Sequence, residues 1–141
     1  SRPMTRSPKA LPNLLPMALA VVWFAACQLT PSPMPNTAKL SHDVYFALKD
    51  TSPEAAQRLV AECYSKLGGI DGVVFLAAGT RDAELTRDVN DRDYHVSLHV
   101  FFRDRAAHDI YQDAPAHLQF IEANKDNWTG VRVFDSNLGQ R

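Results

Sequence analysis

The second half of the domain is organised by the stretch Tyr111-Gln112-Asp113-Ala114-Pro115-Ala116-His117-Leu118-Gln119-Phe120. A residue that precedes proline is disfavoured in α-helical geometry, so a helix through Tyr111 is predicted to break at Ala114. Pro115 can begin a second helix, because the first helical position needs no backbone N–H. The break brings Tyr111 and His117 to adjoining helix ends, where a phenol and an imidazole could face one cavity.

Alternating polar and apolar residues mark the strands on both sides of this break. Strands are predicted at residues 41–49, 73–79, 93–102 and 131–135. In the first strand, His42 is the polar residue on an apolar face that includes Val44 and Phe46. In the third strand, Tyr94 and Val96 are expected on the core face.

Helical patterns separate these strands. Either Thr51 or Ser52 is expected to cap the first helix, which ends at a pair of glycines after Leu67. Asp104 is expected to cap the second helix. The residues predicted to face the core are Ala56, Leu59, Val60, Cys63 and Leu67, then Ala107, Ile110 and Tyr111, then Leu118, Ile121 and Trp128.

The order strand, helix, strand, strand, helix, strand predicts an α+β, ferredoxin-like βαββαβ domain with a four-stranded antiparallel sheet. Helices cover only one face of such a sheet. The other face carries Tyr45, Ala47 and Phe101, with either Val74, Leu76 and Ala78 or Phe75 and Ala77. Exposing that much apolar surface is costly, at about 25 cal/mol per Å². We therefore predict a homodimer in which two sheets pack together.

Charge and ligand spacing exclude several classes of partner. Fifteen basic and 16 acidic residues give a net charge of −1, which argues against a nucleic-acid partner. The acidic loop at residues 80–92 lacks the spacing of a calcium loop. His95 and His99 share a strand face, but they are widely separated and no third ligand is evident. We therefore expect neither a metal nor an organic cofactor.

Residues 1–27 have the pattern of an export signal. Positive residues come first, and an uncharged apolar run follows at residues 17–26. That run is shorter than the roughly 20 residues that span a bilayer. Phe24-Ala25-Ala26-Cys27 resembles a bacterial lipoprotein box, although Phe24 stands where an aliphatic residue is usual. The resemblance implies lipidation of Cys27.

These features predict four regions: the signal at 1–27, a proline-rich linker at 28–38, the folded domain at 39–136 and a tail at 137–141. The protein is accordingly expected to be exported and held on a membrane by a lipid anchor, facing the periplasm or the cell exterior. Secretion as a soluble protein is the alternative.

Residues 39–136 resemble the stress-responsive α/β-barrel (Dabb) family through the order and spacing of several short motifs. The motifs are the leading histidine and closing Leu48-Lys49-Asp50 of the first strand, Thr51-Ser52-Pro53-Glu54, Phe102-Arg103-Asp104-Arg105-Ala106-Ala107, Tyr111 six residues before His117, and Val133-Phe134-Asp135. The resemblance implies a dimer in which two four-stranded sheets close into a barrel.

One branch of that family consists of plant polyketide cyclases, which work without metal or organic cofactor. The likeness implies an acid–base role for His117, a helper role for Tyr111 and a pocket position for His42. The His-Pro-x-His motif of the family has Ala114 in place of its first histidine here.

Two functions remain open. The first is a dimeric module, stress-associated or binding a small apolar ligand without turnover, in a cavity formed by Val44, Phe46, Val96 and Phe120. The second is a cofactor-free cyclase or lyase in which His117 removes a proton beside a carbonyl and Tyr111 stabilises the enolate. Export argues against polyketide substrates, so we favour the first.

A purely structural role is the alternative for each candidate site residue. His117 could simply hydrogen-bond the backbone of the first strand and tie the helix break to the sheet. Tyr111 could be a core aromatic residue with a satisfied hydroxyl. His42 could equally be a satisfied core histidine.

Overall fold

The computed structural model describes residues 38–139. The predicted export signal, Cys27 and nearly all of the linker lie outside the described residues. The elements are β1 (Leu40–Leu48), α1 (Pro53–Leu67), β2 (Val73–Thr80), β3 (Val96–Phe102), α2 (Arg105–Asp113), α3 (Pro115–Asn124), a short 3₁₀ helix (Lys125–Asn127) and β4 (Trp128–Asn137). Among these residues, no helix has the length and apolar character needed to cross a membrane.

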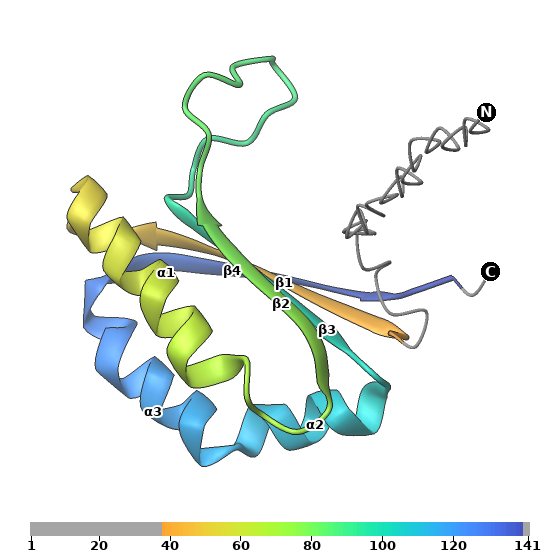
Figure 1. Ribbon diagram of the computed structural model, residues 1–141. Helices are drawn as coiled ribbons and strands as arrows, with labels where there is room; N and C mark the ends of the chain where they lie inside the picture. The colour runs from red at the N-terminus through yellow and green to blue at the C-terminus, as the bar shows by residue number, and fades with distance from the viewer. Residues whose placement is uncertain (1–37, 140–141) are drawn as a thin grey trace, which may run out of the picture. The chain divides into compact units, whose positions relative to one another are not determined.

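The four strands form one antiparallel sheet in the order β2-β3-β1-β4. Within residues 38–139 the helices all lie on the same face of this sheet (Figure 1). This arrangement confirms the predicted ferredoxin-like fold. It also makes β4 an edge strand, next to the central strand β1.

The core lies between the sheet and the helices. Along β1 the side chains alternate as predicted, with His42, Val44, Phe46 and Leu48 buried. The helices contribute the buried stripe of α1, including the free thiol Cys63, and the inward residues of α2 and α3.

Local capping residues set the helix boundaries. Ser52, not Thr51, caps α1, and its hydroxyl accepts a hydrogen bond from the Ala55 N–H at 3.2 Å. Asp104 caps α2 by accepting from the Ala107 N–H at 2.8 Å. Ala114 has extended geometry (φ −63°, ψ 134°), so the helix breaks there as predicted, immediately before Pro115.

The prediction for the start of the third strand was wrong. β3 begins at Val96, and the ring of Tyr94 packs against Tyr45 on the helix-free face, with ring centroids 5.0 Å apart. The guanidinium of Arg132 explains the difference, because it donates to the Asp93 carbonyl and pairs with the Asp91 carboxylate. These contacts hold the residues before Val96 to β4 and interrupt the alternation.

Two residues predicted to face the core are exposed. Ile110 is 55% exposed and Leu118 is 52% exposed. In α3 the buried positions belong to His117 and Phe120, which are three residues apart and share one helix face. Consecutive helical residues are about 100° apart round the axis, so Leu118 is turned outward when His117 faces inward.

The last strand is longer than predicted. Trp128 is its first residue and does not continue a helix face, while Asn137, placed in the tail, still pairs with Leu40. The two alternatives for the second strand are also resolved. Leu76 and Ala78 pack against the core, so Phe75 and Ala77 belong to the helix-free face.

Candidate functional site

A cavity of about 230 Å³ lies between the sheet and the helices, and it is the candidate site. Its lining residues are mostly apolar: His42, Val44 and Phe46 of β1, Leu98 of β3, Tyr111 and Gln112 of α2, His117, Phe120 and Ile121 of α3, and Trp128, Val131 and Val133 of β4. Val96, expected in this cavity, is fully buried in the core and does not line it.

The cavity opens along the edge strand. Val131 and Val133 line it, yet both are exposed large hydrophobic residues. β4 is the edge strand, and among the described residues Val131 is 41% and Val133 is 48% exposed. A small molecule therefore has a route to the buried polar groups.

His117 is held by one ring nitrogen and leaves the other free. Its Nδ1–H donates to the carbonyl oxygen of Gln112 at 3.0 Å. The hydrogen bond therefore joins the start of α3 to the end of α2, and it does not tie the helix break to the first strand. In the neutral ring Nε2 then carries the lone pair, and it has no hydrogen-bond partner among the described residues.

The surroundings of His117 favour the neutral ring. Burial lowers its pKa below the usual value, and the Gln112 hydrogen bond only partly opposes this effect. Positive charge on His42 or His108 would lower the pKa further. Nε2 is therefore a base at neutral pH, not an N–H donor.

Tyr111 lies against His117, with ring centroids 4.4 Å apart and ring planes inclined by 33°. The ring is buried at the end of α2, and burial raises the pKa of its hydroxyl above the ordinary value. Oη has no hydrogen-bond partner among the described residues. A protonated phenol ring is thus stacked against the imidazole that carries the basic nitrogen.

His42 reaches the same cavity from β1. Its ring centroid is 6.0 Å from that of Tyr111, so Tyr111 contacts both histidines. The Nδ1–H of His42 donates to Asp135 Oδ1 at 2.6 Å, and the two residues are directly opposite in the β1–β4 pairing. The three residues singled out from the sequence are therefore neighbours in space.

Three further residues at or beside this cavity were missed as functional residues by the sequence analysis. The sequence patterns predict Asp135 only as the end of a strand and assign no role to His108. Trp128 forms part of the wall, and its indole Nε1–H is buried without an acceptor among the described residues. His108 lies three residues before Tyr111, and this spacing could have placed both residues on one helix face.

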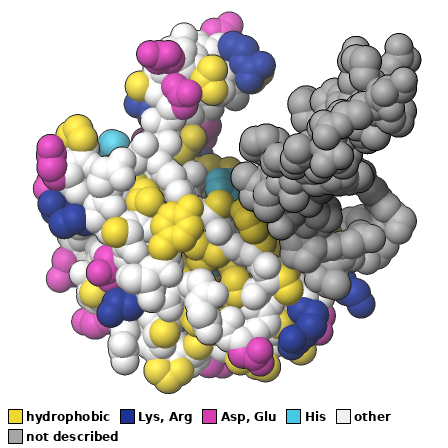
Figure 2. All heavy atoms as spheres, in the orientation of Figure 1, with side chains coloured by type: hydrophobic (Ala, Val, Ile, Leu, Met, Phe, Trp, Pro, Cys, Tyr) yellow, Lys and Arg dark blue, Asp and Glu magenta, His cyan; other side chains and the backbone are white. Residues whose placement is uncertain are grey.

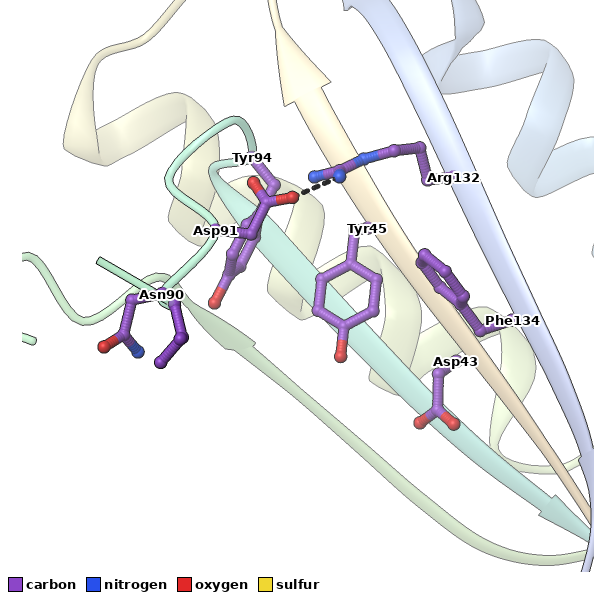
Figure 3. Close-up of a pocket in the computed structure, with 8 residues that line it drawn as sticks. Asp43, Tyr45, Asn90, Asp91, Tyr94, Arg132 and Phe134 are labelled. Atoms are coloured by element: carbon purple, nitrogen blue, oxygen red, sulfur yellow. Dashed lines mark hydrogen bonds and ion pairs between the residues drawn. The ribbon is translucent and has the colours of Figure 1, made fainter. Parts of the chain in front are cut away.

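A second cavity, of about 400 Å³, lies on the helix-free face and is lined by Asp43, Tyr45, Val89, Asn90, Asp91, Tyr94, Arg132 and Phe134 (Figure 3). Its charged groups are already paired, since Arg132 binds Asp91 and Asp43 accepts from the His99 Nδ1–H. This face is also where a second sheet is expected to pack. The smaller, helix-side cavity is the better candidate because Tyr111 Oη, His117 Nε2 and Trp128 Nε1 have no hydrogen-bond partner among the described residues.

His95 and His99 do not converge. His95 Nδ1 accepts from the Leu48 backbone N–H at 3.0 Å, whereas His99 is bonded to Asp43. The pair does not form a site.

Comparison with solved structures finds several proteins of the same fold. A Dabb-family protein from Mesorhizobium loti is 25% identical, with a TM-score of 0.60 over 72% of this chain and 99% of that chain. A dimeric ferredoxin-like protein of unknown function from Thermobifida fusca is 18% identical, with a TM-score of 0.60 over 72% and 92%. A hydroxynitrile lyase from Passiflora edulis is 18% identical, with a TM-score of 0.59 over 74% and 97%.

No curated protein matches the sequence. The family model for the stress-responsive A/B barrel domain matches residues 40–138, close to the limits predicted for the folded domain. The match covers well over half of the 141 residues. The chain therefore belongs to the stress-responsive A/B barrel (Dabb) family.

Proposed function

We propose that this chain is a binding module whose helix-side cavity takes a compact, mainly apolar molecule bearing one carbonyl oxygen. The observation that carries the proposal is the pair of free polar atoms in an apolar wall, Tyr111 Oη and His117 Nε2. Ligand sites generally combine apolar lining with a few polar groups that orient the ligand.

The cavity volume sets the size of the ligand. At roughly 30 Å³ for each water in the liquid, 230 Å³ corresponds to about eight waters. This is less than the roughly 300–1,000 Å³ of cavities for drug-sized ligands. The expected ligand therefore has on the order of ten non-hydrogen atoms.

The polar atoms define how the ligand is oriented. The Tyr111 O–H can donate to a ligand carbonyl, which satisfies a buried hydroxyl that otherwise lacks a partner. His117 Nε2 can only accept in the neutral ring. A carbonyl compound with an acidic hydrogen on the neighbouring carbon suits both atoms.

Acetophenone and isopropylbenzene test this proposal, because they have the same number of non-hydrogen atoms and differ in the carbonyl. Binding is measured by NMR titration of the wild-type chain and of Tyr111→Phe. We expect Tyr111→Phe to weaken acetophenone at least fivefold and to leave isopropylbenzene unchanged. Tyr64→Phe is the matched control, since the Tyr64 hydroxyl bonds to the Ala78 backbone away from the cavity. Equal affinity of both compounds for the wild-type chain would refute the proposed recognition.

A second candidate function is proton abstraction in the same cavity, and the hydrogen bonding of His117 favours it. Because Nδ1–H is held by Gln112, the free nitrogen is a positioned base, and Tyr111 can donate to the enolate oxygen that forms. The lyase from Passiflora edulis has the same fold, which makes such chemistry possible on this scaffold.

Exchange of the acetophenone methyl hydrogens in D₂O separates the two functions. A chain that only binds the ketone leaves the methyl signal at its uncatalysed rate of decay. A chain that removes the proton accelerates the decay, and His117→Asn abolishes that acceleration.

We further propose that the module acts as an exported, lipid-anchored homodimer. The apolar helix-free face and the dimeric relative from Thermobifida fusca support the dimer. The pattern ending in Cys27 supports the anchor. If Cys27 is lipidated, the wild-type protein partitions with membranes and Cys27→Ser moves to the soluble fraction.

A further inference from the structure

Three side chains with metal-ligating atoms converge beside the cavity: His42, His108 and Asp135. One ligand atom of each lies within 4.8 Å of the other two. His42 Nδ1 is 2.6 Å from Asp135 Oδ1, and His108 Nε2 is 3.9 Å from the same oxygen. The residues come from β1, α2 and β4, so only the folded chain brings them together.

Regular secondary structure fixes this arrangement. His42 and Asp135 are directly opposite in the antiparallel pairing of β1 with β4. The His108 ring packs edge-on against His42, with centroids 5.3 Å apart, and against Phe102 at 5.4 Å. Ligands carried on strands and a helix are held more exactly than ligands on loops.

We propose that His42, His108 and Asp135 bind a divalent transition-metal ion of the Zn²⁺ type. Two imidazole nitrogens and one carboxylate oxygen are ligands that Zn²⁺ accepts, and three protein ligands leave a fourth position open. This proposal replaces the expectation of no metal, which rested on the acidic loop at residues 80–92 and on the pair His95 and His99.

The geometry is close to what a bound ion needs. Ligand bonds of roughly 2.0–2.2 Å in a tetrahedron put neighbouring ligand atoms roughly 3.3 Å apart. The two imidazole nitrogens lie within 4.8 Å of each other. At Asp135, the 2.6 Å contact must open and the 3.9 Å contact must close, each by less than 1 Å. Asp135 can make both adjustments because its side chain is 49% exposed.

The hydrogen bonding of His108 already selects the required tautomer. Its Nδ1–H donates to the Asp109 carboxylate at 3.1 Å, which leaves the Nε2 lone pair towards Asp135. A second carboxylate that holds the far nitrogen of a ligating histidine is the usual arrangement around protein-bound zinc. The Gln112 amide, 3.1 Å from Nε2, must move aside when the ion binds.

Zinc titration of the full-length chain, purified without a histidine tag, tests the site. Isothermal calorimetry should show one saturable Zn²⁺ per chain, weakened at least tenfold in His108→Gln and in Asp135→Asn. His99→Gln is the matched control, because His99 is also bonded to an aspartate at 2.6 Å but lies outside the cluster. This control should bind Zn²⁺ as the wild type does.

Cobalt substitution gives a readout that needs no variant. Co²⁺ in a site of low coordination number absorbs strongly in the visible range, and added Zn²⁺ should displace it from the wild-type chain. The proposal would be overturned if the wild-type chain showed no saturable Zn²⁺ binding. It would also be overturned if His108→Gln kept the wild-type Zn²⁺ affinity, or if His99→Gln lost as much affinity as His108→Gln. The result is independent of ketone binding, so the proposed function and the metal site can fail separately.

Discussion

His117 uses one ring nitrogen to hold the structure and offers the other to the cavity. His117→Ala removes the donor to the Gln112 carbonyl and should lower the free energy of unfolding by about 1–3 kcal/mol. His117→Asn can keep a donor near the Nδ1 position and should lose less. Urea unfolding of the three proteins measures the difference. If both variants unfold like the wild type, the hydrogen bond has no structural role.

The same residue should make stability depend on pH. Its folded pKa is lowered, mainly by burial, so between the folded value and the unfolded value near 6.5 the unfolded chain binds more protons. Stability is therefore complete above about pH 6.5 and is lost as the pH falls through the folded pKa. His42 and His108 face the ring and oppose its charge. In His117→Asn, the urea midpoint should decrease less between pH 7 and pH 5 than it does in the wild type. If the decrease is the same in both proteins, other groups cause it.

The residues of the site differ in how far the sequence could predict them. Tyr111 and His117 are six positions apart, and the backbone rule at Pro115 was enough to place them together. His42 and Asp135 are 93 positions apart and meet through the register of β1 with β4. No local pattern specifies that register, so the pair could not have been predicted.

The turn between α1 and β2 depends on one glycine. Gly72 has a φ of +88°, and a Cβ at this position would lie 2.4 Å from the Cβ of Ala107 in α2. Gly72→Ala should cost about 2–4 kcal/mol, from left-handed backbone strain and overlap with the helix. Gly79→Ala is the control, since a Cβ there meets nothing within 4 Å, and it should change stability little. If thermal melts give the two variants the same melting temperature, the backbone around residue 72 can move away from Ala107 at little cost.

At the level of elements, short-range rules succeeded and long-range contacts caused the errors. The Asp104 cap and the proline break act within a few residues, and both are where the sequence put them. The prediction that Tyr94 faces the core was wrong because Arg132, far along the chain, holds the preceding residues to β4. The prediction that Leu118 faces the core was wrong because the imidazole of His117 occupies the buried position. A search for hydrophobic periodicity does not anticipate a buried polar residue.

Among the residues that the structure describes, helices cover one face of the sheet and leave the other face bare. Hydrophobic side chains gather over the strands in Figure 2. The bare face contains two aromatic clusters, Phe75 with Phe101, and Tyr45 with Tyr94 and Phe134. Aromatic groups of this size bury 150–250 Å² each when they are covered. Their exposure in a single chain is the physical reason to expect a partner sheet.

A charge placed on that face should therefore separate the subunits. Phe134 and Leu118 are each 52% exposed, on the bare face and on the helices respectively, so they form a matched pair. Phe134→Lys should give a monomer, because dimer formation would bury an unpaired ammonium group. Leu118→Lys should remain a dimer, and sedimentation at micromolar concentration distinguishes the two. A wild-type chain that stays monomeric as its concentration rises would contradict the paired-sheet arrangement. If both variants remain dimers, the dimer interface does not include Phe134.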